Sequence, residues 1–479
     1  MIQRSRRGCW TCKRRHKKCD ETRPVCERCT QAGMACEGYE TRLIWGPSDT
    51  TTPKTGMVLN PVRQSRPQRR LRRSRVVDVL PDDSLDLGAE LSDLYQVPSP
   101  DQLDLLYLQY ESNGQASTEN LPSDEVSNRL MQDFSTTGYQ TLTGRDGQEG
   151  LFKSDILPLC NSCVSLRQVC LAYQASLDTE MVRLTPIYMQ SALSHYFNDL
   201  NTPEKLELDA TLATGVLLCS LSINSLYIWT PLLKGLYGVL QHRGILTAAQ
   251  RSPLEDHLLE VIALLDVPSF TLNRITRSME IWKLHVASKG QVGIEQTSGL
   301  PYSLINLFAG LGSPEAEEGL LGWAGELGEE FIQIHLWEAF RFAGVLHNRA
   351  LLGNDQNTSP PAASPMPRSE VVRMKIFASL QAIVDSGAFT FRQPLARAIF
   401  YPLFIAGLFA ENYQQRRLTR LAFQHLMEDS QERIDGSTEK VALDIVTNVW
   451  ETGKGQGLTA KLALATKFAA ELNIELHLY

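Results

Sequence analysis

The chain has 479 residues, more than a single globular domain usually contains, so more than one folded unit is expected. With 43% hydrophobic and 21% charged residues, it has enough apolar residues for a large core, which excludes global disorder. Residues 1–76 contain 19 Lys and Arg against 6 Asp and Glu, a net +13, and the formal net charge of −7 for the whole chain leaves −20 for the remainder. A basic arm on an acidic body is typical of proteins that bind polyanions. The N-terminus, MIQRSRRGCW, lacks the apolar region of a secretory signal, so export is not expected.

Residues 1–45 are predicted to form a compact, cysteine-rich unit. Six of the ten cysteines follow the spacing C-x2-C-x6-C-x6-C-x2-C-x6-C, in which one half-pattern occurs twice. These six are Cys9, Cys12, Cys19, Cys26, Cys29 and Cys36. Each C-x2-C pair can bring two sulfurs to one metal across a tight turn. In a reducing interior such crowding favours metal, and disulfides remain the alternative until a compartment is shown.

The number of ligands predicts how two zinc ions would be held. Two tetrahedral ions require eight ligand positions, whereas this unit supplies six cysteines and no well-placed histidine, so two thiolates must bridge both metals. A closed, all-thiolate site leaves no position for water, so the two zinc ions are expected to be structural rather than catalytic. So short a segment cannot bury a sufficient core, and metal binding should supply much of its folding free energy.

A basic stretch separates the second and third cysteines. It supplies the candidate DNA contacts Lys13, Arg14, Arg15, His16, Lys17 and Lys18. Lys and Arg neutralise phosphates and donate to guanine O6 and N7 in the major groove, so a short helical turn of this composition fits double-stranded DNA. The matching stretch of the second half, residues 30–35, has no basic residue. The first half is therefore expected to face DNA, with the second half supporting it.

The segment GCWTCKRRHKKCDETRPVCERC resembles the fungal binuclear zinc cluster family of transcription factors, and the resemblance covers residues 8–36 without a gap. It assigns the six ligands in three pairs: bridging Cys9 and Cys26, first-site Cys12 and Cys19, and second-site Cys29 and Cys36. Pro24 stands where the family has a proline that turns the loop between the halves. The resemblance implies that the basic helix reads CGG-like triplets.

One position departs from the family pattern. His16 stands where the family most often has a lysine that contacts the bases, and a neutral imidazole makes one hydrogen bond without replacing an ammonium group. Specific DNA binding is expected, with CGG as the expected triplet. Family dimers usually form through a coiled coil after the cluster, but residues 46–100 show no run of apolar heptads, which leaves a homodimer and its half-site spacing open.

Residues 46–100 are predicted to be a disordered linker rich in Pro, Ser, Thr and Arg. Residues 63–75 contain seven arginines, of which Arg69, Arg70, Arg72 and Arg73 are the nuclear import candidates. The alternative is a solvated basic linker that adds non-specific phosphate contacts. Acidic and apolar residues alternate over residues 77–110, as in activation segments, although a first amphipathic helix is the favoured interpretation for residues 101–110.

Residues 101–479 are predicted to be an all-α domain. Apolar residues recur at helical spacing in blocks such as FIQIHLWEAFRFAGVLHNRALL, Leu and Ala are abundant, and strand-like alternation is scarce. The uncharged residues 210–233 are long enough to cross a membrane, but their Ser, Asn and Pro content favours two core helices broken near Asn224. The Pro/Ser-rich residues 353–368 predict a disordered loop.

Three segments of this domain, residues 151–177, 229–244 and 401–417, are similar to the fungal-specific transcription factor domain. The similarity lies mainly in the apolar pattern and in a few aromatic and Gly positions. It implies a helical regulatory domain, and it gives no catalytic residues to carry over to this chain.

Several features of this domain have plain structural interpretations. Cys160, Cys163 and Cys170 repeat the half-pattern without a second half, which favours core cysteines over a third metal site. The GKGQG of residues 453–457 lacks the spacing of a phosphate-binding loop and predicts a flexible turn. Neither HExxH nor GxSxG occurs, so we expect no enzyme.

The sequence predicts a mainly α, nuclear regulator of RNA polymerase II genes. Its expected partners are double-stranded DNA and the transcription machinery or coregulators, with a homodimer and a small-molecule effector as further candidates and no membrane. Activation of metabolic or biosynthetic genes, including secondary-metabolite clusters, is a family-level expectation. The alternative is a ligand-sensing or protein-interaction scaffold that uses DNA binding only for placement.

Overall fold

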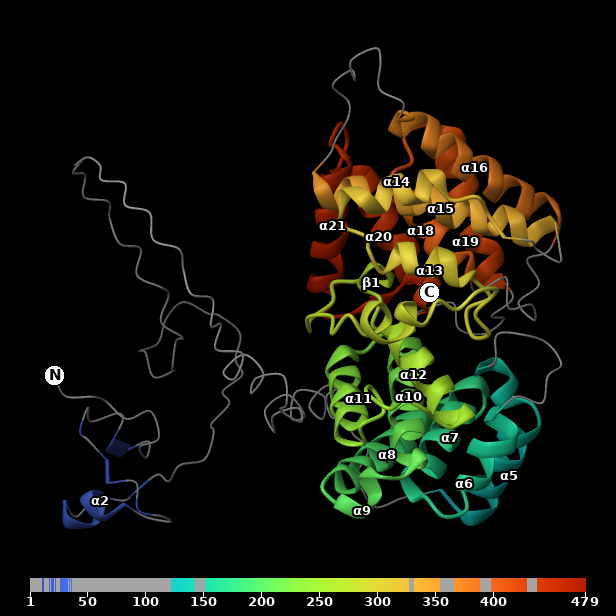
Figure 1. The fold of residues 1–479 in the computed structure, drawn as a ribbon. Helices are drawn as coiled ribbons and strands as arrows, with labels where there is room; N and C mark the ends of the chain where they lie inside the picture. Colours follow the sequence, from blue (N-terminus) through green and yellow to red (C-terminus); the bar gives the residue numbers. More distant parts are fainter. Residues whose placement is uncertain are drawn as a thin grey trace, which may run out of the picture. The chain divides into compact units, whose positions relative to one another are not determined.

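The computed structural model describes residues 11–12, 17, 19–20, 22, 26–32, 34, 36, 122–142, 151–326, 331–353, 366–387, 398–428 and 437–479. The chain divides into two compact units, Met1–Ser84 and Leu85–Tyr479 (Figure 1). The predicted linker of residues 46–100, the import candidates Arg69, Arg70, Arg72 and Arg73, and the acidic stretch up to residue 110 lie outside the described residues.

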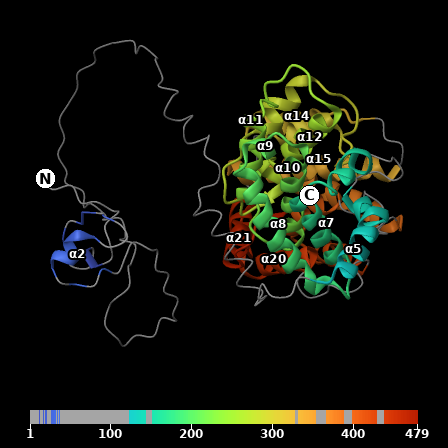
Figure 2. The same cartoon turned by 90° about the horizontal axis from the view of Figure 1, so that it is seen from below.

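The second unit, called the body below, begins with one group of helices. Their bounds are α5 (Asp124–Thr136), α6 (Leu157–Leu159), α7 (Val164–Leu177), α8 (Thr185–Leu200), α9 (Pro203–Leu206), α10 (Asp209–Asn224), α11 (Thr230–His242) and α12 (Pro253–Leu265). Helix α10 lies at the centre of this group, in contact with α7, α8, α11 and α12 (Figures 1 and 2). Its sequence, DATLATGVLLCSLSIN, is apolar or small on every side, as is typical of a helix that is buried all round.

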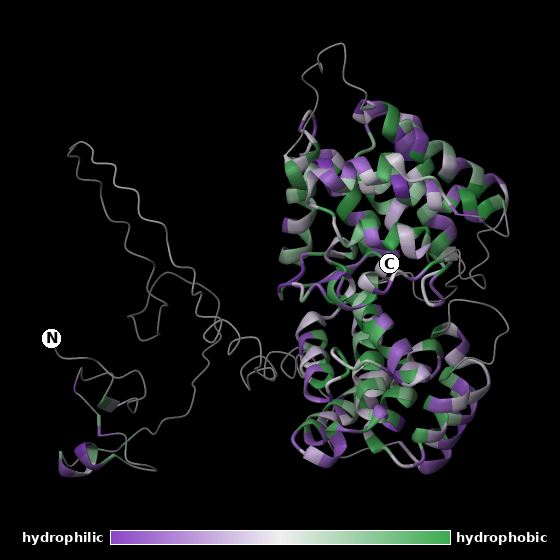
Figure 3. Cartoon of the chain, viewed as in Figure 1, coloured by the Kyte–Doolittle hydropathy of each residue, from purple (hydrophilic) through white to green (hydrophobic). Residues whose placement is uncertain are grey.

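A second group of helices completes the body. Their bounds are α13 (Tyr302–Phe308), α14 (Pro314–Gly322), α15 (Phe331–Leu352), α16 (Ser369–Asp385), α18 (Phe400–Leu408), α19 (Tyr413–Glu428), α20 (Thr438–Thr452) and α21 (Leu458–Glu471). The long helix α15 packs against α14, α16, α18 and α21. Hydrophobic and hydrophilic residues share most of these helices, which fits amphipathic elements around one core (Figure 3).

A short two-stranded sheet brings the end of the described chain into the middle of the body. Strand β1 (Thr271–Leu272) pairs antiparallel with β2 (Leu476–His477). The ring of Tyr479 stacks on Phe270 at 5.1 Å between centroids, and Phe270 also meets Tyr401 of α18 at 5.4 Å. Segments about 200 residues apart in sequence are thus held together by both backbone pairing and aromatic packing.

The mainly α architecture is confirmed, because strands within the described part of the chain are limited to β1 and β2. The uncharged residues 210–233 form α10 and the start of α11, with the break directly after Asn224 as predicted. Among the described residues, no helix is both long and apolar enough to span a membrane. Gly453 ends α20 and Gly457 precedes α21, so the GKGQG segment is a turn between helices. Most of the predicted loop at 353–368 lies outside the described residues.

Candidate zinc centre and nucleic-acid interface

Cysteine sulfurs of the N-terminal unit gather in two overlapping groups. The Sγ atom of Cys12 lies 3.8 Å from that of Cys26 and 3.9 Å from that of Cys29. A second group combines Cys19, Asp20 and Cys26, and in each group the donor atoms lie within 4.8 Å of one another. Cys26 belongs to both groups, which is the position expected of a thiolate that bridges two metals.

The backbone around Cys26 is folded onto the sulfurs. Cys26 is the N-cap of α2 (Glu27–Gln31), and its sulfur accepts a hydrogen bond from the Cys29 N–H at 3.3 Å. The Cys26 N–H in turn donates to the sulfur of Cys36 at 3.5 Å. Hydrogen bonds from backbone N–H groups stabilise the charged form of an acidic group, here a thiolate, which is the form that binds metal.

The residues present fit a pair of structural zinc ions. Cys26 and Cys29 are fully buried and Cys12 is 2% exposed. The buried cluster of the described N-terminal residues consists of cysteines, and Cys36 packs against it. Closely spaced thiolates are the donor set that zinc prefers in a closed site. When bound, the ions supply cross-links rather than reactivity. Cys9 lies outside the described residues, so the allocation of the six ligands to two sites stays a prediction.

Asp20 is a structural residue that the sequence reasoning missed. Its carboxylate accepts hydrogen bonds from the N–H groups of Glu27 at 3.0 Å and Arg28 at 2.8 Å, at the start of α2. It also accepts from the Thr22 hydroxyl at 2.5 Å, and this bond, followed by the backbone bonds, holds the pKa of Asp20 well below its usual range. The sequence signal that could have indicated this role is the position of an acidic residue directly after the third cysteine. Asp20 joins the two halves because it lies beside Cys19 and caps the helix of the second half.

The structure describes one residue of the basic stretch. Lys17 is exposed, and its backbone N–H donates to the carbonyl of Cys12 at 3.0 Å. It lies between Cys12 and Cys19, which are both buried, so the two ends of the stretch are anchored in the cysteine cluster. The other predicted contacts, Lys13, Arg14, Arg15, His16 and Lys18, lie outside the described residues.

The second cysteine-rich segment is part of the core. Cys160 and Cys170 are buried, with their sulfurs 3.7 Å apart, whereas Cys163 is half-buried at the N-terminus of α7. Burial raises the pKa of the Cys170 thiol, which opposes formation of a thiolate. Within the described residues, groups of three close metal-binding side chains occur in the N-terminal unit and not here. The interpretation as core cysteines is confirmed for Cys160 and Cys170.

Comparison with known proteins gives two family matches. Residues 7–45 match the fungal Zn(2)-Cys(6) binuclear cluster domain, and residues 129–317 and 315–459 match the fungal specific transcription factor domain. The match to the fungal specific transcription factor domain covers more than half of the chain. No solved structure matches the chain.

Curated relatives are similar over the cysteine-rich segment. Transcriptional regulatory protein pro1 of Neurospora crassa is 47% identical over 49 residues, 10% of this chain and 7% of that protein. The aspercryptin biosynthesis cluster-specific transcription regulator atnN of Emericella nidulans is 58% identical over 36 residues, 8% of this chain and 6% of its own length. Arginine metabolism regulation protein II of Saccharomyces cerevisiae is 47% identical over 38 residues, 8% of this chain and 4% of its own. This chain therefore matches less than a tenth of the length of each of these relatives.

Proposed function

Because the chain belongs to the fungal-specific transcription factor domain family and carries a fungal Zn(2)-Cys(6) binuclear cluster domain, we propose that it regulates RNA polymerase II genes by binding specific DNA sites. In this proposal the zinc cluster binds double-stranded DNA in the nucleus, and the helical body controls the transcriptional output. The family matches identify a transcriptional regulator rather than an enzyme.

The observation that carries the proposal is the anchoring of the basic stretch. Buried sulfurs lie on both sides of it, at Cys12 and Cys19, and Lys17 between them is exposed. A cationic segment whose two ends are fixed loses less conformational entropy when it meets phosphates than a free segment does. Each lysine or arginine that contacts a phosphate adds affinity that falls with increasing salt concentration.

Two matched variants test which half of the cluster faces DNA. Lys17→Gln removes an exposed charge from the first half, and Arg28→Gln removes one from α2 in the second half. We expect K17Q to weaken binding by roughly 3- to 10-fold and to reduce the salt slope by about one unit, whereas R28Q stays within about twofold of wild type. Fluorescence anisotropy on a CGG-containing duplex at several salt concentrations measures both. Equal losses in the two variants would contradict this orientation.

The base triplet is tested by binding-site selection. We expect CGG to be enriched, and His16→Lys to strengthen that enrichment because an ammonium donates to guanine where a neutral imidazole makes one hydrogen bond. Selection that returns no enriched triplet with either protein would contradict sequence-specific binding. The spacing of selected triplets also tests a homodimer, since paired half-sites at fixed spacing require two copies.

For the output, we propose activation of metabolic or biosynthetic genes. The relatives include a biosynthesis cluster-specific regulator and a regulator of arginine metabolism, by their names. A reporter assay in which a foreign DNA-binding domain replaces the cluster tests activation, and reduced reporter expression would indicate repression through corepressors instead. Genome-wide occupancy mapping would identify the target genes.

Nuclear import is proposed to depend on Arg69, Arg70, Arg72 and Arg73. Replacing all four by Ala should reduce nuclear accumulation of a fluorescent fusion. Unchanged nuclear accumulation would indicate that the four arginines belong to a solvated basic linker and do not direct import.

The second candidate function, a ligand-sensing body that uses DNA binding for placement, is favoured by one observation. The body contains a cavity of about 810 Å³ between α11 and residues 266–284. This is within the range of small-molecule sites in proteins. Ligand-dependent thermal stabilisation of the protein tests it, and a broad screen without stabilisation would count against it.

A further inference from the structure

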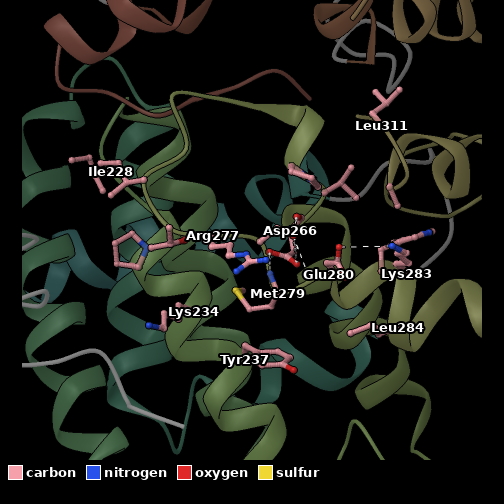
Figure 4. Close-up of a pocket in the computed structure, with 18 of the residues that line it drawn as sticks. Ile228, Lys234, Tyr237, Asp266, Arg277, Met279, Glu280, Lys283, Leu284 and Leu311 are labelled. Atoms are coloured by element: carbon pink, nitrogen blue, oxygen red, sulfur yellow. Dashed lines mark hydrogen bonds and ion pairs between the residues drawn. The ribbon is translucent and has the colours of Figure 1, made fainter. Parts of the chain in front are cut away.

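The cavity of the body has a mixed polar and apolar lining. Its wall combines residues of α11 with the segment from β1 to η5 (Trp282–Val286), and Figure 4 shows the side chains that line it. Part of the lining is apolar: Trp282 and Val267 are buried, whereas Ile275 and Leu284 are more than half exposed and offer free apolar surface. Such a wall favours an apolar ligand body.

The loop of residues 273–281 is held along its length by a buried carboxylate. Asp266 is 1% exposed, and its side chain forms an ion pair with Arg274 at 2.6 Å. It also accepts hydrogen bonds from the Ser278 hydroxyl at 3.0 Å and from the Ile281 N–H at 3.1 Å. These bonds satisfy the charge of Asp266 within the protein, so it does not repel an anion in the cavity as an unpaired carboxylate would.

A second buried carboxylate fixes the same loop from the other side. Glu475 accepts a hydrogen bond from the Ile275 N–H at 2.5 Å and from the N–H groups of Trp229 and Thr230 at 2.8 Å each. The loop is therefore tied both to α12 and to the start of α11. A wall held in this way is preorganised, which lowers the entropic cost of binding a ligand.

Two cations of the lining have no partner within the described part of the protein. Lys234 is half-buried on α11, and Arg277 is exposed on the fixed loop; neither makes an ion pair or a hydrogen bond with another described residue. Lys283, in contrast, lies 3.8 Å from Glu280, and Figure 4 draws this pair as a dashed line. The lining thus carries a net positive charge, because its two carboxylates are each paired with a basic residue while Lys234 and Arg277 are not.

We infer that this cavity binds a small organic acid whose carboxylate or sulfonate is held by Lys234 and Arg277 and whose apolar body lies against Ile275 and Leu284. A charged donor meeting an anion at the edge of an apolar wall makes a stronger hydrogen bond than a neutral pair. The inference rests on the proposed function for its regulatory meaning, since such a ligand would be the effector of a transcription regulator. The binding itself is independent of DNA.

The test uses two probes with nearly the same ring system. 8-Anilino-1-naphthalenesulfonate carries the anionic group, and N-phenyl-1-naphthylamine lacks it. Both are titrated by fluorescence against the zinc-loaded full chain. In the Lys234→Gln and Arg277→Gln double variant we expect the affinity for the sulfonate to fall about tenfold, while the affinity for the neutral probe changes less than about twofold.

A matched control removes the same charge elsewhere. Arg183 and Lys454 are exposed and lie outside the cavity lining, so the double variant R183Q/K454Q should bind both probes as wild type does. A second variant, Ala309→Phe, places a ring at the cavity wall and should weaken both probes. Equal sulfonate affinity in wild type and K234Q/R277Q, or unchanged binding of both probes in A309F, would overturn the inference.

DNA affinity of the same proteins is measured in parallel. Failure of wild-type protein to bind any selected duplex would defeat the proposed function, with the probe titrations still deciding the cavity. Conversely, normal DNA binding with no charge-dependent probe binding would defeat the cavity inference alone.

Discussion

In the N-terminal unit the buried described residues are almost all cysteines, whereas in the body they are mainly aliphatic and aromatic residues in one continuous cluster. A core of four to six sulfurs buries too little apolar surface to oppose the conformational entropy of the chain. The body buries many large side chains and requires no metal for that purpose. The comparison teaches that zinc should control the fold of one unit and leave the other unaffected.

The largest expected effect is the loss of the zinc centre in Cys26→Ser. Cys26 belongs to both sulfur groups, so its replacement should release zinc and abolish specific DNA binding. Elemental analysis and anisotropy on the selected duplex measure the two losses, and C163S in the body is the matched control that should keep both properties. Retention of two zinc ions by C26S would contradict the predicted dependence of the zinc centre on Cys26.

Removal of the Glu475 carboxylate should strongly destabilise the body. Glu475→Ala leaves the buried N–H groups of Trp229 and Thr230, and the partly buried N–H of Ile275, without their acceptor, which should lower the free energy of unfolding by about 3–5 kcal/mol. Urea unfolding followed by circular dichroism measures it. The control, Glu471→Ala, removes an exposed partner of Lys467 and should cost less than about 0.5 kcal/mol. Equal effects of the two variants would contradict the role of Glu475.

Acid should destabilise the body through two buried histidines. Burial lowers the pKa of both His347 and His477 to about 4, whereas an unfolded histidine has a pKa of about 6.5. Between these values the unfolded chain binds more protons, so the free energy of unfolding is fully present above about pH 6.5 and falls as the pH is lowered towards 4.

The expected loss is up to about 1.4 kcal/mol per pH unit for each histidine within that window. His347→Gln keeps a side chain that can hydrogen-bond Tyr401, whose hydroxyl lies 2.9 Å from His347 Nδ1, and should reduce the pH slope by the contribution of one histidine. Urea unfolding at pH 7.5, 6.0 and 5.0 measures the slope. An undiminished slope in H347Q would remove His347 from the explanation.

A pair of glycines sharpens the contrast between packed and open positions in the body. A Cβ at Gly215 of α10 would lie 2.4 Å from both Leu236 Cδ2 and Tyr196 Oη, so Gly215→Ala should cost about 1–3 kcal/mol. Gly238 of α11 has no atom within 4 Å of such a Cβ, so Gly238→Ala should stabilise by about 0.5–1 kcal/mol through helix propensity. Thermal midpoints compare the two, and stabilisation by both would contradict the packing around α10.

The features that the sequence predicted correctly are those set by neighbouring residues. The break after Asn224 follows from local Ser, Asn and Pro content, and the turn at residues 453–457 follows from its glycines. The cysteine spacing identified the zinc cluster because the two cysteines of each C-x2-C pair are close in the sequence and can bind one metal.

The contacts that escaped prediction join distant segments. Glu475 contacts Trp229 across 246 positions and Ile275 across 200, and nothing in the local sequence of any of them indicates the partner. The same holds for the cavity, whose cations Lys234 and Arg277 come from a helix and a loop that are separate in the sequence. The contact of Asp20 is intermediate in predictability. Asp20 lies close to α2 in the sequence, but the sequence alone does not show which of the neighbouring acids caps the helix.

Removal of zinc from the full chain tests the central claim most directly. We predict two zinc ions per chain by elemental analysis, loss of specific DNA binding when a chelator removes them, and recovery when zinc is restored, while the helical circular dichroism and the thermal midpoint of the body stay unchanged. Undiminished DNA affinity after verified removal of the metal would contradict the account.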